Sequence, residues 1–217
     1  MKKEVVEQIN KLIEEVESCA IDDEFKGYKA SPLLKKIDEL ILANADKEKD
    51  TLLFIFETYH FLMQTYVRMG RFVLSAKYGE RALDIAIILD KEYQEKLDYL
   101  GSLLDHLFSY RNYYVDDDCL DLYEKVKAAD VVALDQLDIV FNRMKTRRRR
   151  TLKHDPVEMS EAYLKVIDGV EEKIDQNRTC YGMGSCHEIW ALKFEYLLEK
   201  GINWKSPQML NSRVMFD

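Results

Sequence analysis

Apolar residues recur along this chain with the spacing of α-helices. Near the amino terminus they follow i, i+4, i+7, i+8 and i+11, as on one face of an amphipathic helix: Val5, Ile9, Leu12, Ile13 and Val16. A second helix is predicted to begin at Ser31 and Pro32, because serine is a preferred N-cap and proline lacks only an N–H that the first turn does not use. The predicted buried face of that helix comprises Leu33, Leu34, Ile37, Leu40 and Ile41.

The stretch 56–89 contains two apolar-periodic segments separated by one glycine, Gly70. So short a connection predicts an antiparallel helix pair, and glycine suits the left-handed position that follows a helix end. Small residues at Ser75, Gly79 and Ala82 are expected to let the two helices approach closely. The two predicted buried faces are Leu53, Phe56, Tyr59, Leu62, Met63 and Tyr66, and Phe72, Ser75, Ala76, Ala82, Leu83 and Ile87.

Large and small side chains alternate along this helix pair in a recognisable order. The residues are Tyr59, Leu62, Tyr66, Gly70, Phe72, Ser75, Ala82 and Leu83. Their order resembles the signature of the tetratricopeptide repeat (TPR), a helix-turn-helix of about 34 residues. The chain departs from that signature at Met63, Gly79 and Ile87. The resemblance implies an all-α fold in which antiparallel helix pairs form a right-handed superhelix, a TPR-like α-solenoid.

Two looser helix pairs follow at a spacing of roughly forty residues. In the second pair, residues 97–104 have the L-x-x-L-G-x-x-L spacing of a first helix, and residues 120–126 form a short second helix. In the third pair, residues 134–144 form one helix, and Asp155 begins the other as an N-cap before a proline, with Glu158 completing a capping box. Because no single pair can bury its own apolar face, stacked pairs are what a solenoid requires.

The carboxyl-terminal segment predicts a capping helix and a tail. The helix is expected from Ser185, with Glu188 completing a capping box, to Gly201, and Ser206 before a proline is a further N-cap. The segment reads C-H-x-x-W, then G-I-x-W-x-S-P, then F-D, and resembles the ending of uncharacterised bacterial proteins that have Asn-Pro where this chain has Asn211-Ser212. We expect the apolar tail to pack on its own last helices, because exposed apolar groups favour aggregation.

The sequence therefore predicts a single TPR-like helical domain over residues 1–217. Its expected parts are N-terminal helices in 1–50, three helix pairs in 51–176, and the capping helix and tail in 177–217. Apolar residues make up 47% of the chain, and eight glycines with three prolines favour long helices over short strands. We find no signal peptide and no apolar run of about eighteen residues, so no membrane span is expected. Four scattered cysteines indicate reduced thiols and a cytoplasmic location.

The TPR resemblance implies a protein-protein interaction module that binds a peptide or protein partner on its concave face. In that family the face is lined by first-helix positions next to the core signature. In this chain those positions are Glu57, His60, Gln64, Val67 and Arg68, then Asp98, Ser102, Asp105 and His106, then Asp135 and Arg143, with Arg147 nearby. The mixture of charged and polar groups suits a segment held by side-chain contacts. No catalytic residue, metal ligand or cofactor is assigned.

Two other hypotheses remain open. The run Arg147 to Arg150 is strongly basic, so it is a candidate contact for nucleic acid in a regulator, with Arg148 on the packing side of its helix. The net charge of −8 and the lack of interleaved aromatics argue against this. Cys186 and His187, in the first turn of a helix, are a candidate enzyme or metal site. Adjacent helical residues point about 100° apart, so His187 is poorly placed as a base for Cys186.

Overall fold

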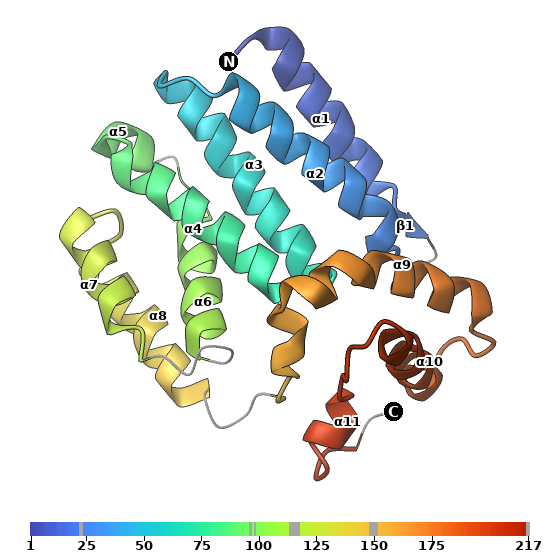
Figure 1. The fold of residues 1–217 in the computed structure, drawn as a ribbon. Helices are drawn as coiled ribbons and strands as arrows, with labels where there is room; N and C mark the ends of the chain where they lie inside the picture. The colour runs from blue at the N-terminus through green and yellow to red at the C-terminus, as the bar shows by residue number, and fades with distance from the viewer. Residues whose placement is uncertain (22–23, 96, 98, 113–117, 148–151, 216–217) are drawn as a thin grey trace. The chain divides into compact units, whose positions relative to one another are not determined.

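The fold is described from a computed structural model, which describes residues 1–21, 24–95, 97, 99–112, 118–147 and 152–215. Among these residues the regular secondary structure is helical apart from one short antiparallel hairpin, β1 (Ala20–Ile21) with β2 (Glu24–Phe25). This confirms the predicted all-α class. The longer helices are α1 (Lys3–Glu17), α2 (Gly27–Asn44), α3 (Lys49–Arg68), α4 (Phe72–Ile88), α6 (Leu100–Tyr110), α7 (Leu120–Ala129), α8 (Leu134–Arg147), α9 (Glu161–Asn177) and α10 (Ser185–Glu199). The short ones are α5 (Lys91–Gln94), the 3₁₀ turn η2 (Pro156–Met159) and α11 (Pro207–Leu210) (Figure 1).

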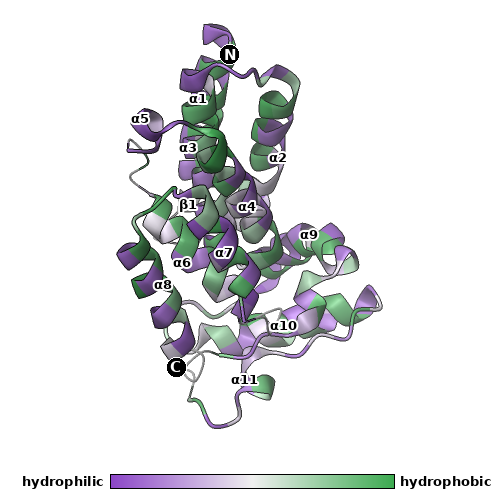
Figure 2. Ribbon diagram, turned by 90° about the vertical axis from the view of Figure 1, so that its left-hand side faces the viewer, coloured by the Kyte–Doolittle hydropathy of each residue, from purple (hydrophilic) through white to green (hydrophobic). Residues whose placement is uncertain are grey.

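The chain divides into two compact units, and each is described by itself. Unit 1 comprises Met1–Ile13 and Leu34–Thr151, and unit 2 comprises Glu14–Leu33 and Leu152–Asp217. The division passes within α1 and within α2. Figure 2 shows hydrophilic and hydrophobic residues within the same helix, for example in α1 and α3, as expected for amphipathic helices.

Unit 1 is organised around the predicted hairpin of α3 and α4. Gly70 has φ +67°, Arg71 N–H donates to Tyr66 O at 2.8 Å, and Gly70 N–H donates to Val67 O at 2.9 Å. These two bonds form a Schellman motif, which ends α3 and reverses the chain. Helix α6 packs against α4 and α8, and α7 packs against α8 (Figure 1).

The close approach predicted for α4 occurs at Gly79. A Cβ atom there would lie 3.0 Å from Leu107 Cδ2 and 3.1 Å from Met63 Sδ. Gly79 therefore admits side chains of both α3 and α6 against the α4 backbone. Around it the core is dominated by buried residues of the predicted signature, among them Tyr59, Leu62, Tyr66, Ala82 and Leu83.

A buried charge links α2 to α4 in unit 1. Asp38, only 9% exposed, accepts hydrogen bonds from Tyr78 Oη at 2.9 Å and from Arg81 Nη1 at 2.6 Å. The Arg81 guanidinium lies over the rings of Tyr59 and Tyr78, 5.5 and 5.4 Å from their centroids. The carboxylate is thus paired and hydrogen-bonded, as a buried charge must be.

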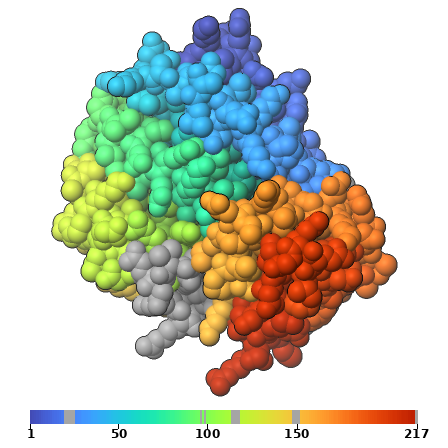
Figure 3. All heavy atoms as spheres, viewed as in Figure 1, coloured from blue at the N-terminus to red at the C-terminus, as the bar shows by residue number. Residues whose placement is uncertain are grey.

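Unit 2 has a separate apolar core, in which the tail takes part. The core cluster is Tyr163, Ile167, Val170, Ile174, Tyr196, Leu197, Ile202 and Trp204. Trp204 is 1% exposed, and its Nε1 donates to Glu158 Oε1 at 2.7 Å. Asn211 exchanges hydrogen bonds with the backbone of Lys153, at 2.8 and 2.9 Å. The tail therefore packs on its own last helices, as expected, and Figure 3 shows the red atoms of the C-terminal end of the chain against the orange atoms that precede them in unit 2.

Three predicted helix starts differ in detail. Helix α2 begins at Gly27 and not at Ser31, whose hydroxyl donates to Asp168 Oδ2 at 2.7 Å. Asp155 does cap a helical turn, but that turn is the four-residue η2, and Ser160 caps α9. A Ser-Pro or Asp-Pro pair is typical of a helix start, but it also fits a backbone that is already helical before it. The pair alone therefore does not fix where a long helix begins.

The start of α10 differs in its capping. Gly184, at φ +84°, precedes the helix, which has no side-chain cap bond. Glu188 instead accepts from the backbone N–H groups of Thr179 and Cys180, at 2.9 and 2.7 Å. The glutamate fixes the loop before the helix and does not form the predicted box with Ser185.

Candidate functional site

The predicted binding positions of α3 form one stripe along that helix. Glu57, Gln64 and Arg68 are exposed and Val67 is half-buried. His60, in the same stripe, is only 9% exposed. Burial lowers the pKa of His60 below 6.5, so the imidazole is neutral at pH 7.

His60 connects this stripe to α6. Its ring stacks on Tyr99, with centroids 4.7 Å apart and planes 12° from parallel. Its Nε2 lies 3.4 Å from both Gln64 Nε2 and Ser102 Oγ. Tyr99 is 50% exposed and was not predicted from the sequence, because it is the N-cap of α6 and lies just before the helix. The predicted neighbour Asp98 lies outside the described residues.

His106 faces the hairpin and not the exposed stripe. Its Nε2 is 2.9 Å from the hydroxyl of Ser75, which is fully buried and itself donates to Phe72 O at 2.8 Å. A hydroxyl has one hydrogen, so when Ser75 gives it to Phe72 O, the Ser75–His106 contact is a hydrogen bond donated by His106 Nε2. Burial lowers the pKa of His106 to about 4, against an opposing effect of Asp105. His106 thus joins α6 to α4.

The next contact continues the exposed stripe from α6 to α8. Asp105 Oδ1 lies 3.9 Å from Arg143 Nη1, and the side chain of Arg143 is half exposed. Asp135 is exposed in the first turn of α8. We use the term α3–α6–α8 surface for Glu57, His60, Gln64, Arg68, Tyr99, Ser102, Asp105 and Arg143. The structure thus brings together predicted residues of three helices.

Two other predicted sites stand as follows. Arg147 ends α8, and Arg148 to Arg150, including the predicted packing position, lie outside the described residues. Cys186 and His187 occupy the first turn of α10, as expected, and the His187 ring meets Trp190 edge-on at 5.7 Å. Among the described side chains, no group of three or more His, Cys, Asp or Glu is arranged to hold a metal ion.

None of the described helices has the length and apolar character needed to cross a membrane.

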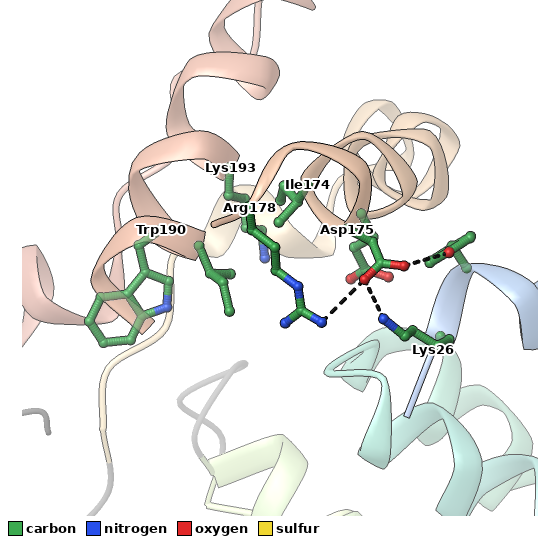
Figure 4. Close-up of a pocket in the computed structure, with 10 residues that line it drawn as sticks. Lys26, Ile174, Asp175, Arg178, Trp190 and Lys193 are labelled. Carbon is green, nitrogen blue, oxygen red and sulfur yellow. Dashed lines mark hydrogen bonds and ion pairs between the residues drawn. The ribbon is translucent and has the colours of Figure 1, made fainter. Parts of the chain in front are cut away.

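Unit 2 contains a pocket that the sequence did not predict (Figure 4). It has a volume of about 250 Å³ and lies among the start of α2, the C-terminal half of α9 and the first turns of α10. Its lining residues are Lys26, Gly27, Tyr28, Glu171, Ile174, Asp175, Arg178, Ile189, Trp190 and Lys193. Since Lys26 and Asp175 are far apart in sequence, no local spacing signals this pocket.

The polar end of the pocket is built on Asp175. Its Oδ1 pairs with Lys26 Nζ and with Arg178 Nη2, the latter at 3.2 Å, and its Oδ2 accepts from Tyr28 Oη at 2.9 Å. The hydrogen bond from Lys26 lowers the pKa of Asp175, so this carboxylate is charged at pH 7. Burial and the bond to Asp175 raise the pKa of Tyr28 to about 12, which keeps its hydroxyl a donor.

Comparison of the chain with protein-family models, curated proteins and solved structures finds no match. The functional argument therefore rests on the sequence and on the geometry above.

Proposed function

We propose that the chain is a protein-interaction module that binds a peptide segment of a partner protein on the α3–α6–α8 surface. The observation that carries the proposal is the contact of His60 with Tyr99 and Ser102, continued by the contact of Asp105 with Arg143. These contacts join residues of α3, α6 and α8, the three helices that the sequence predicts as the first members of its helix pairs. Neighbouring first helices are also what line the concave face of a TPR array.

A TPR-like superhelix for unit 1 is part of this proposal. It is supported by the α3–α4 hairpin and by the order of packing, in which α6 contacts α4 and α8. The contacts between first helices join residues 42 and 38 positions apart in sequence, for His60 with Ser102 and Asp105 with Arg143. Both values are close to the repeat length inferred from the sequence.

The chemistry of the surface indicates the kind of segment that would bind. Its acids, Glu57 and Asp105, balance its bases, Arg68 and Arg143, and His60 is neutral. A strongly acidic or basic peptide therefore gains little from it. The half-exposed Tyr99 ring offers a rigid apolar contact among side chains that donate and accept hydrogen bonds. We infer a partner segment with uncharged polar side chains and at least one apolar anchor.

The location proposed for this module is the cytoplasm. Its support is the cysteine usage: Cys19, Cys119, Cys180 and Cys186 are thiols that are not joined in disulfides.

The proposal is tested by selecting peptides from a random display library against the purified chain and measuring their affinity. Gln64→Ala with Arg68→Glu, and separately Arg143→Glu, are expected to weaken selected peptides at least tenfold. Lys36→Glu, a charge reversal at an exposed position of α2, is the matched control and should leave affinity unchanged. Peptides that bind all variants equally would place the binding site elsewhere and overturn the proposal.

A further inference from the structure

We propose that the pocket of unit 2 binds a free α-amino acid with an apolar side chain. The geometry of the pocket points to this ligand, because one end carries both positive and negative side chains and the other end is apolar. Figure 4 shows Lys26 and Asp175 at one end, Trp190 at the other, and the Arg178 guanidinium between them. This site is distinct from the α3–α6–α8 surface, and nothing in the proposed peptide binding depends on it.

The cationic groups of the pocket are held in fixed positions. The side chain of Arg178 is 6% exposed and that of Lys26 is 14% exposed, and both contact Asp175. Arg178 also lies over the ring of Tyr181, 4.6 Å from its centroid. A guanidinium fixed in this way is well suited to a carboxylate, because its planar donors match the two oxygens. We assign the ligand carboxylate to Arg178 and Lys26.

The acids of the same end suit an ammonium group. Glu171 and Asp175 both line the pocket. Lys193, the third cation, lies 4.0 Å from Glu158, so the three cations are matched by three carboxylates. A ligand with net charge would leave an uncompensated charge beside the largely buried side chains of Arg178 and Lys26, which is unfavourable. A zwitterion preserves the balance, and its ammonium group lies toward Asp175 and Glu171.

The apolar end and the volume define the side chain of the ligand. Ile174, Ile189 and Trp190 supply apolar and aromatic surface. A cavity of about 150 Å³ holds benzene, so about 250 Å³ holds about ten non-hydrogen atoms, the size of leucine, methionine or phenylalanine. A longer peptide exceeds this volume, and none of its residues carries both the ammonium and the carboxylate group.

Titration calorimetry of the full chain with L-leucine, L-methionine and L-phenylalanine tests the proposal. For a ligand of this size we expect a Kd between about 10 µM and 1 mM for at least one of them. N-acetyl-L-leucine lacks the ammonium group and L-leucinamide lacks the carboxylate, so each should bind at least tenfold more weakly than L-leucine. An N-acetyl analogue that binds as well as the amino acid would overturn the zwitterion assignment. Absence of binding by all three amino acids at about 5 mM would overturn the site.

Variants locate the binding in the pocket. Arg178→Gln should weaken the amino acid tenfold or more, whereas Lys165→Gln, at an exposed position of α9, should leave its affinity unchanged. Trp190→Phe retains an apolar ring, so it should keep binding within a few-fold while reducing any ligand-induced change in tryptophan fluorescence. Because Arg178→Gln also removes a contact to Asp175, circular dichroism must show that this variant is folded. If it is not, the analogue series on the unaltered chain decides.

Discussion

Burial fixes the ionisation of His106, and this makes stability depend on pH. The pKa of the ring falls from 6.5 to about 4 on folding. Between these two pH values the ring is protonated in the unfolded chain and neutral in the folded chain. Stability therefore falls as pH drops from about 6.5 to about 4 and loses on the order of 3 kcal/mol from this residue. His106→Gln keeps a donor for Ser75 without titrating in this window. Urea unfolding at pH 7 and pH 4 should show a smaller loss in the variant. Equal losses would contradict the buried, neutral imidazole.

Gly79 and Gly101 are expected to respond oppositely to added side chains. A side chain at Gly79 meets Leu107 and Met63 at about 3 Å, so Gly79→Val should cost about 1–3 kcal/mol through overpacking. Gly101, on α6, has nothing within 4 Å of an added Cβ. Gly101→Ala should therefore gain about 0.5–1 kcal/mol from helix propensity. Midpoints of thermal unfolding measure both. A neutral Gly79→Val would mean that α4 is not closely packed here.

At the scale of elements, helix faces were predictable and some helix starts were not. The apolar period identifies α1, α3 and α4, because one buried face dictates its own spacing. The start of α2 was not predictable, since Ser31 uses its hydroxyl for Asp168, a residue far along the chain. Glu188 was misassigned for the same reason: a capping-box spacing does not reveal that a loop will supply other donors.

The tail acts as an element of the unit 2 core through Trp204. Trp204→Ala should cost about 3–5 kcal/mol, because it removes a fully buried ring and leaves Glu158 without an indole donor. Met215→Ala is the control in the same tail, and at 93% exposure it should change stability by no more than about 0.5 kcal/mol. Denaturant unfolding of both variants measures these changes in the free energy of unfolding. A mild effect of Trp204→Ala would show that the tail is not part of the core.

At the scale of the molecule, the division into two units was not predictable. The sequence predicts a single TPR-like domain over residues 1–217, and in the structure unit 2 joins 14–33 to 152–217. Contacts such as Lys26 with Asp175 join residues 149 positions apart, and periodicity carries no signal at that range. The sequence could group the residues proposed for binding on α3, α6 and α8, because those that meet in the structure are about forty positions apart. The pocket of unit 2 was not, since it takes residues from segments with no common repeat.

Net charge predicts the outcome for nucleic acid. A chain of formal charge −8 repels the phosphate backbone, and local bases must outweigh that repulsion before any DNA binds. We expect no retention of duplex DNA in electrophoretic shifts at about 0.15 M salt, where screening already weakens a local basic run. Replacing Arg147 to Arg150 by glutamine should change nothing. Retention that falls steeply with salt, and disappears in the glutamine variant, would contradict this and favour the arginine run as a nucleic-acid contact, because each phosphate contact adds to the salt dependence.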